Sequence, residues 1–215
     1  MKSAIGFISR DENAYLAFCL ANKAMSIQRD WSNPGEPLVW RPFQLAFILL
    51  SLESSADDSH PDRGIADLLW FPTGGGKTEA YLGLIAFVLF YRRLRFKGAG
   101  CGIAAIMRYT LRLLTTQQFQ RASALVCACE TIRLENPGVD GKPVPLGEKI
   151  PFSIGLWVGN DATPNKLSGD RKWPGTREIL RIAIDDRKSD PVQLTNCPRH
   201  PDSELRWTFR EEGED

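Results

Sequence analysis

The stretch that decides the fold is LLWFPTGGGKTEAYLGL, from Leu68 to Leu84. An apolar run ends in Pro-Thr and three glycines, and Lys-Thr then opens a second apolar segment. Short apolar runs that end in Pro and Gly are typical of buried parallel strands, and the residues beyond Gly76 are typical of a long helix. A glycine-rich turn between a strand and a helix is an arrangement that binds phosphate.

The same order of elements continues along the chain. We predict buried strands at residues 65–71, 101–108 and 152–159, and helices at residues 11–25, from Pro42 onward, and at 76–95, 109–135 and 176–184. Strands that alternate with helices at this spacing are typical of a parallel α/β sheet flanked by helices. Such sheets bind ligands at the carboxyl ends of their strands, which is where the glycine-rich turn lies in the sequence.

Each residue of the turn suits a different part of a nucleotide. Gly74, Gly75 and Gly76 let the backbone approach phosphate closely, and a helix that begins there directs free N–H groups and its positive dipole end toward the anion. Lys77 is predicted to reach the β- and γ-phosphates, and Thr78 to offer its hydroxyl to Mg²⁺. The simpler alternative is a glycine-rich turn followed by an exposed Lys-Thr pair.

Composition excludes several other classes of protein. The 215 residues include 27 Lys plus Arg and 26 Asp plus Glu, so bulk charge gives no indication of nucleic-acid binding. The five cysteines are odd in number and lack a framework spacing, and no signal-peptide core follows Met1. The longest apolar run, residues 80–91, is shorter than the roughly 20 residues of a membrane-spanning helix. We expect a soluble cytoplasmic protein without a membrane partner.

Phe71 stands where the general phosphate-loop pattern has its first glycine. FPTGGGKT instead resembles the first motif of superfamily 2 helicases, in which Thr73 also belongs to the nucleotide site. The upstream WRPFQ resembles the setting of a glutamine that contacts adenine in these helicases, which would give Gln44 that role; alone, Gln44 reads as a surface helix residue. MRYTLRLLTTQQFQRA resembles the helicase motif that grips one nucleic-acid strand, with four matching residues: Arg108, Thr110, Arg112 and Gln117. The alternative there is a helix cap with solvated arginines.

Together with FSIGLWVG at 152–159, these motifs resemble the large helicase of the DISARM anti-phage defence system. The resemblance implies an incomplete RecA-like first helicase domain at residues 40–184, a helical segment before it at 1–39, and a polar tail at 185–215 where a zinc-binding insertion can begin. It also implies an ATP-driven DNA translocase that uses Mg²⁺ and works with a partner subunit.

A helicase of this kind also needs an acidic pair that positions Mg²⁺ and the attacking water. Asp185 and Asp186 follow a short apolar run, but its helix-like periodicity makes them a poor match. A second motor domain does not fit in this length. We therefore expect nucleotide binding but little or no ATP hydrolysis by this chain alone. Two alternatives stay open: a non-hydrolysing phosphate-loop module that serves as a scaffold, and the remnant of a truncated gene.

Two further features carry smaller expectations. Cys197 and His200 have the Cys-x-x-His spacing of zinc ligands, but they supply only two of the four ligands of a structural site, which makes zinc within this chain the minority interpretation. Trp70 and Trp157 are predicted to lie in the core.

Overall fold

The structure is a computed structural model. It describes residues 1–72, 74–109, 112–136, 143–147, 149–158, 164, 166–170, 172–186, 194–200 and 202–205, with the backbone alone at 112–116 and 183–186. The chain divides into two compact units, Met1–Ile154 and Gly155–Asp215, and each is described by itself.

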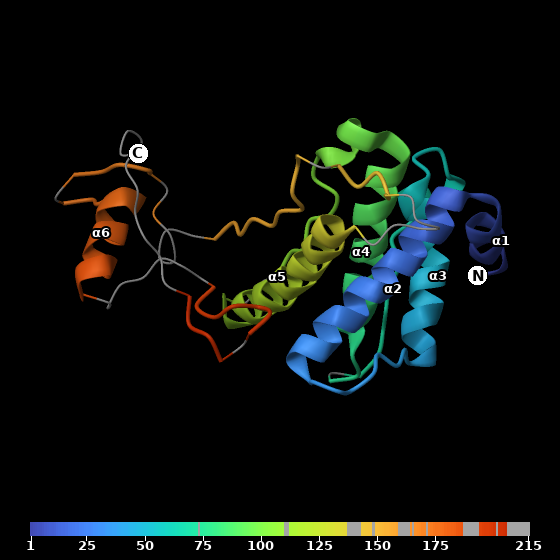
Figure 1. Cartoon of the computed structure of the whole chain (residues 1–215), viewed down its shortest axis with the longest axis horizontal. Coiled ribbons are helices and arrows are strands. Elements are labelled where there is room, and N and C mark those ends of the chain that lie inside the picture. Colours follow the sequence, from blue (N-terminus) through green and yellow to red (C-terminus); the bar gives the residue numbers. More distant parts are fainter. Residues whose placement is uncertain are drawn as a thin grey trace. The chain divides into compact units, whose positions relative to one another are not determined.

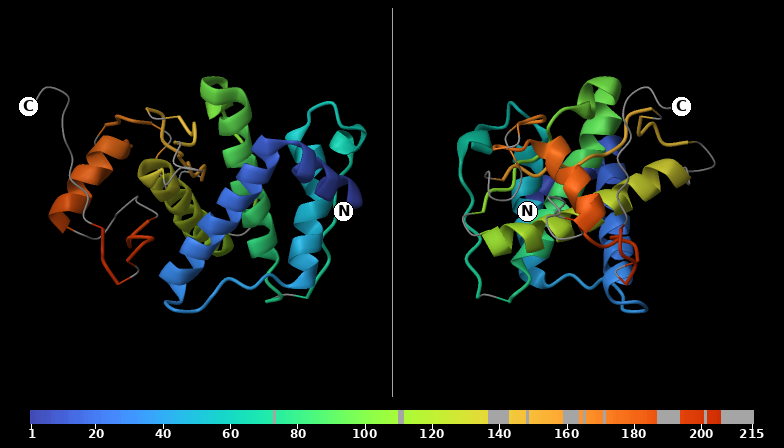
Figure 2. Two further views of the ribbon diagram at one scale, coloured as in Figure 1. Left: turned by 45° about the vertical axis from the view of Figure 1, so that its right-hand side comes forward. Right: turned by 90° about the vertical axis from the view of Figure 1, so that its left-hand side faces the viewer.

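The first unit is built from helices (Figures 1 and 2). Helices α2 and α3 both pack against α4, and α2 also packs against α5. The bounds are α1 Lys2–Arg10, α2 Glu12–Ser32, α3 Pro42–Ala56, α4 Lys77–Phe96 and α5 Arg112–Glu135, with short 3₁₀ turns at Pro61–Gly64 and Lys97–Cys101. Helix α4 is therefore the element around which the other long helices are arranged.

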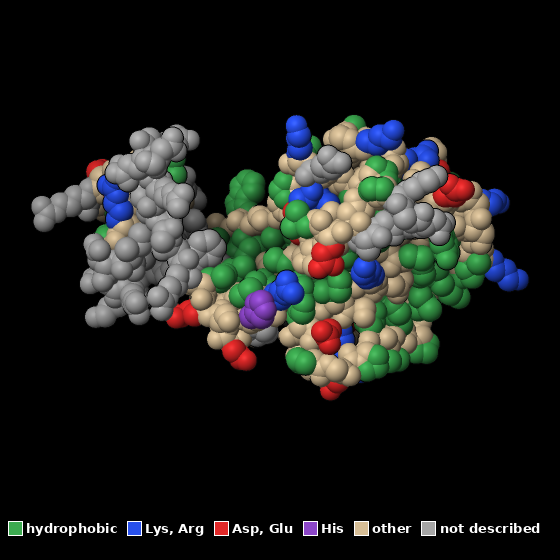
Figure 3. Space-filling model, viewed as in Figure 1, with side chains coloured by type: hydrophobic (Ala, Val, Ile, Leu, Met, Phe, Trp, Pro, Cys, Tyr) green, Lys and Arg blue, Asp and Glu red, His purple; other side chains and the backbone are tan. Residues whose placement is uncertain are grey.

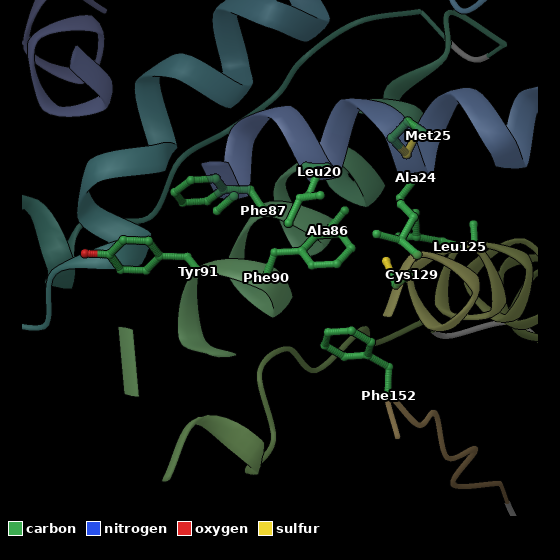
Figure 4. Close-up of a cluster of buried hydrophobic side chains, with 14 of the residues drawn as sticks. Leu20, Ala24, Met25, Ala86, Phe87, Phe90, Tyr91, Leu125, Cys129 and Phe152 are labelled. Atoms are coloured by element: carbon green, nitrogen blue, oxygen red, sulfur yellow. The ribbon is translucent and has the colours of Figure 1, made fainter. Parts of the chain in front are cut away.

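The hydrophobic core lies between α2, α4 and α5 (Figure 4). Phe87 and Phe90 of α4 and Leu125 of α5 are fully buried, and Phe90 meets Phe152 edge-on with ring centroids 5.4 Å apart. Small side chains on the facing helices, such as Ala17 and Ala24 of α2, let the helix axes approach closely. The core is thus formed by helix-on-helix packing.

The predicted parallel α/β, RecA-like sheet is wrong for this structure. Among the described residues there is no strand, only an isolated antiparallel bridge between Asn196 and Glu204. The described residues of the segments predicted as strands lie outside any sheet, and Cys101 belongs to a 3₁₀ turn. Many of their apolar side chains are exposed: 89% for Leu68, 90% for Trp70 and 84% for Ile106. Hydrophobic side chains accordingly reach the visible surface in Figure 3. The prediction that Trp70 and Trp157 lie in the core is wrong as well, since Trp157 is 97% exposed.

The residues that lead into the third predicted strand, 150–152, show the physical reason, because side chains take bonds that a neighbouring strand would make. The guanidinium of Arg93, which is 4% exposed, donates to the Ile150 oxygen at 2.9 Å and to the Pro151 oxygen at 3.0 Å. The Phe152 N–H donates to Glu130 Oε2 at 2.9 Å, and Arg93 also lies over the Phe152 ring. Residues 150–152 are thus bound to α4 by the buried Arg93 and to α5 by the half-buried Glu130, so these backbone groups are satisfied without a sheet.

The predicted helices are confirmed. Helix α3 begins at Pro42, where a missing N–H is tolerated, and the predicted helix at 76–95 is observed as α4. Helix α1 was not predicted. Asp11 separates it from α2 and caps α2, because its carboxylate accepts from the Ala14 N–H at 3.0 Å. One acidic residue thus ends one helix and starts the next.

The second unit contains helix α6, Thr176–Asp186, and a turn region at residues 194–205. Asp185 and Asp186 belong to α6, in line with the helical periodicity that made them a poor match to an acidic catalytic pair. None of the described helices combines the length and the apolar character that crossing a membrane requires.

Tyr91 provides a test of this packing. Its ring is buried, and its hydroxyl, which points away from the hydrophobic cluster in Figure 4, donates to Asp11 Oδ2 at 3.2 Å. Burial, together with the Asp11 charge, raises the pKa of Tyr91 to about 12. The folded-state pKa lies above the unfolded value of about 10, so the folded protein holds the hydroxyl proton more tightly than the unfolded chain does. The contribution of the protonated hydroxyl to the free energy of unfolding is therefore complete below pH 10 and is lost as the pH rises toward 12.

Stability measured by urea unfolding should therefore fall between pH 10 and pH 12, and Tyr91→Phe should flatten that decline. Tyr15→Phe is the matched control, since Tyr15 is 60% exposed. An unchanged slope in Tyr91→Phe would contradict the described environment of this hydroxyl.

Candidate nucleotide-binding site

The glycine-rich turn lies between the extended segment that ends at Pro72 and the first turn of α4. Gly74 and Gly76 have φ values of 77° and 87°, which side chains rarely adopt. Gly76 is the N-cap of α4 and, having no side chain, leaves the first N–H groups of the helix uncovered by a capping group of its own. Thr73, a predicted site residue, lies outside the described residues.

The carbonyl groups of the turn are bonded to cationic and amide side chains. The Lys77 ammonium donates to the oxygens of Phe71 and Pro72, the latter at 3.2 Å. Arg41 Nη1 donates to the Gly75 oxygen at 2.7 Å. The positive side chains therefore hold the turn closed through its carbonyl oxygens. The Gly75 N–H donates to the Pro72 oxygen at 3.1 Å, so the donors that face an anion are the first N–H groups of α4, which have no partner within the helix.

Gln44 braces the same turn from α3. Its Nε2 donates to the Gly76 oxygen at 2.7 Å, while its Oε1 accepts from the Arg41 N–H at 2.8 Å. The residue is 4% exposed. Its amide uses one donor and one acceptor within the protein, and an amide carries two hydrogens and two lone pairs.

Phe71 packs against Phe43 at the start of α3. The two rings are stacked, with centroids 3.8 Å apart and planes 14° apart. The Phe71 ring also lies beside Gly75, where an added Cβ would meet the Pro72 oxygen at 2.9 Å and a Phe71 ring carbon at 3.1 Å. A glycine at position 71 would remove the stack that joins the turn to α3.

A carboxylate beside the turn is neutralised by an ion pair. Glu79, in the first turn of α4, pairs through Oε1 with Arg121 of α5. Its Oε2 is buried and has no hydrogen-bond partner among the described residues. The Arg121 main chain is itself fixed, because its oxygen accepts from Gln28 of α2 at 2.9 Å. The Arg121 charge limits the repulsion that Glu79 would exert on a bound phosphate.

The predicted nucleic-acid residues lie before and within the start of α5. Arg108 is exposed at the end of an extended segment, and Gln117 is exposed on α5. Arg112 begins α5, where the backbone alone is described, and Thr110 lies outside the described residues. Helix α5 packs against α4 and is joined to the turn through the Arg121–Glu79 pair.

Cys197 and His200, the predicted zinc ligands, belong to the second unit, where the Cys197 Sγ and His200 Nδ1 atoms are 3.7 Å apart. Sequence patterns did not single out Arg41, Phe43, Glu79 or Arg121 as part of the site. Arg41 and Phe43 precede Gln44 within WRPFQ, and Glu79 follows Lys-Thr directly, so their positions in the sequence were an available signal. Nothing in the sequence marks Arg121 as the partner of Glu79.

Comparison with known proteins gives one informative relationship. No family model matches the chain. Over 188 residues it is 44% identical to the DISARM protein DrmA of Bacillus paralicheniformis, and the match covers 78% of this chain but 16% of DrmA. The chain thus spans about a sixth of the length of that relative. This level of identity shows that the chain is homologous to a portion of a DISARM protein DrmA.

Proposed function

We propose that the turn at residues 71–78 binds the phosphates of ATP with Mg²⁺ at the N-terminus of α4. The observation that carries this proposal is the polarity of the turn. Its carbonyl oxygens at Phe71, Pro72, Gly75 and Gly76 are bonded to Lys77, Arg41 and Gln44, while a 20-residue helix with Gly76 as its N-cap begins at Lys77. The dipole of that helix and its first N–H groups favour an anion.

Lys77 and Thr78 would make the direct contacts. When triphosphate binds, the Lys77 ammonium leaves the Phe71 and Pro72 oxygens and pairs with the β- and γ-phosphates. Thr78, the second residue of α4, offers its hydroxyl to Mg²⁺. Arg41 and Gln44 keep the turn in shape while Lys77 moves, because they bond to Gly75 and Gly76 on the other side of the turn.

The match to a portion of DrmA suggests which process ATP binding would serve. As the helicase motifs imply, ATP binding would serve a DNA translocase of the DISARM anti-phage system that works with a partner subunit. Arg108, Arg112 and Gln117 would contact the phosphate backbone of one DNA strand, which positions the strand without reading its sequence. The Glu79–Arg121 pair joins the helix of the nucleotide turn to α5, which carries Arg112 and Gln117.

Removing the Lys77 charge tests phosphate binding. Lys77→Ala should weaken Mg·ATP binding about 10- to 100-fold in calorimetric titration, because a hydrogen bond to a charged group is worth roughly 1.5–3 kcal/mol. Lys23→Ala, which removes an exposed lysine of α2, should leave the affinity unchanged. If wild type and Lys77→Ala bind Mg·ATP with equal affinity and have the same circular dichroism, the proposal is wrong.

Gln44 tests whether the bound base is adenine. Gln44→Leu should lower the affinity for ATP by roughly tenfold more than the affinity for GTP, because the lost amide bonds are specific to the adenine edge. GTP serves as the internal control, since any loosening of the turn acts on both nucleotides through Gly76. An equal loss of affinity for ATP and GTP would show that Gln44 only holds the turn in place and does not contact the base.

Arg108 tests the DNA contact. Arg108→Ala should weaken binding of a labelled single-stranded DNA of mixed sequence and should reduce the slope of log affinity against log salt by about 1. Arg10→Ala removes another exposed arginine, at the end of α1, and should change neither quantity. If both variants show the same slope as wild type, Arg108 contacts no DNA phosphate.

A further inference from the structure

We propose that Glu79 competes with triphosphate for the N-terminus of α4, and that Arg121 of α5 allows nucleotide to bind by holding the Glu79 carboxylate aside. This role rests on the proposed phosphate site and adds the helix that regulates it. Two observations carry it. One oxygen of Glu79 lies beside the N-cap without a hydrogen-bond partner among the described residues, and the other is held by a residue of a different helix.

Glu79 is the third residue of α4, which begins at Lys77 after the N-cap Gly76. A glutamate at this position commonly turns back toward the N-cap, where its carboxylate accepts from a free N–H group and suits the positive end of the helix dipole. The same features of a helix N-terminus favour a phosphate group. A Glu79 carboxylate that turned back would therefore occupy the place of the anion and repel it.

The Glu79 side chain lies close to the N-cap in the structure. A Cβ placed on Gly76 would lie 3.2 Å from Glu79 Oε2 and 2.7 Å from Gln44 Nε2. Glu79 Oε2 is buried and has no hydrogen-bond partner in the described part of the chain. A buried carboxylate oxygen without a donor is unfavourable, and the first N–H groups of α4 are the donors that it would reach by turning back.

Arg121 keeps the carboxylate from turning back. Its Nη2 atom pairs with Glu79 Oε1, and its main-chain oxygen accepts from Gln28 Nε2 at 2.9 Å. Gln28 is buried on α2, and Ala122 and Leu125, which follow Arg121 on α5, belong to the hydrophobic core. The guanidinium thus extends from a packed part of α5, and it holds Glu79 by one oxygen on the side of that helix.

The Glu79–Arg121 pair contributes little to the stability of the fold. The two side chains are 32% and 41% exposed, and water screens ion pairs at this exposure. The hydrophobic core, which includes Phe90 of α4 and Leu125 of α5, already joins the two helices. The pair is therefore better explained by the charge that it withdraws from the phosphate site than by a contribution to folding.

Helix α5 consequently regulates the affinity of the site for nucleotide. A contact that draws Arg121 away from Glu79 releases the carboxylate toward the N-terminus of α4 and weakens triphosphate binding. Bound triphosphate in turn favours the paired position of Arg121, because coupling between two sites is reciprocal. The regulating element is thus one helix of this chain, and it acts on the phosphate site through a single charge.

Calorimetric titration with Mg·ATP tests the role of Arg121. Arg121→Ala should weaken binding about tenfold, because the released Glu79 charge then lies against the phosphates. Adding Glu79→Gln to this variant should restore the wild-type affinity, since the amide carries no charge. Arg121→Lys, which keeps the positive charge, should retain most of the affinity.

The charge of the ligand separates repulsion from a general loosening of the turn. The loss of affinity in Arg121→Ala should be smaller for Mg·ADP than for Mg·ATP, because the diphosphate carries less negative charge. A loosened turn would instead lower both affinities by the same factor.

Arg29→Ala is the matched control, because the Arg29 side chain on α2 is 42% exposed and forms a comparable ion pair with Glu36. This variant should bind Mg·ATP like the wild type. Binding that is unchanged or tighter in Arg121→Ala would overturn the role of Arg121. So would a loss of affinity that persists in the double variant with Glu79→Gln.

Amide NMR without nucleotide separates this role from ATP binding itself. In Arg121→Ala the amide signals of Gly76, Lys77 and Thr78 should shift as the carboxylate reaches the N-terminus of α4, and adding Glu79→Gln should reverse the shift. Identical signals in wild type and Arg121→Ala would show that the carboxylate does not turn back. A wild type that binds no Mg·ATP would contradict the proposed function instead, and the nucleotide-free spectra would still decide where the carboxylate lies.

Discussion

The burial of helix α4 is the constraint on which the candidate site depends. Phe87 and Phe90 are fully buried between α2 and α5, and the packing of large aromatic side chains contributes several kcal/mol each to stability. A helix fixed along its length has a fixed first turn. The position of Gly76, Lys77 and Thr78 is therefore set by hydrophobic packing several turns away, while the turn itself adds the polar contacts.

The contacts around the turn explain its departure from the general phosphate-loop pattern. A glycine at position 71 would give the chain more freedom, but Phe71 instead stacks on Phe43 and ties the turn to α3. From the same helix, Arg41 and Gln44 bond to Gly75 and Gly76. WRPFQ and FPTGGGKT, which are separate in the sequence, are therefore joined by direct side-chain contacts in the structure. A turn that is already closed loses little conformational freedom when it binds an anion.

The helices could be predicted from the sequence because their signals are local. Pro42 at a first turn and the apolar spacing of Leu125, Cys129 and Ile132 each need only a few neighbouring residues. The sheet could not, since an apolar extended run becomes a strand only if a distant segment pairs with it. The Phe152 N–H, at the start of the third predicted strand, donates to the Glu130 side chain instead, and a pattern of apolar residues does not reveal such a contact.

The candidate site follows the same division between local and distant signals. The residue types of the turn indicated phosphate binding directly, whereas the Phe43–Phe71 stack and the Arg121–Glu79 pair join residues far apart in the sequence. The predicted relationship to the DISARM system agrees with the 44% identity to a portion of DrmA, while the helicase assignment stays a prediction. Sequence motifs thus indicated the relationship, while the arrangement of the chain around them had to come from the structure.

The central claim is that the glycine-rich turn and the first N–H groups of α4 bind triphosphate, and amide NMR of the labelled chain tests it most directly. Titration with Mg·ATP should shift the amide signals of Gly74, Gly75, Gly76, Lys77 and Thr78 first and most strongly, with one common binding constant. In Lys77→Ala the same shifts should require a far higher concentration of Mg·ATP. Signals at the turn that stay unchanged at saturating Mg·ATP, while others move, would contradict the account.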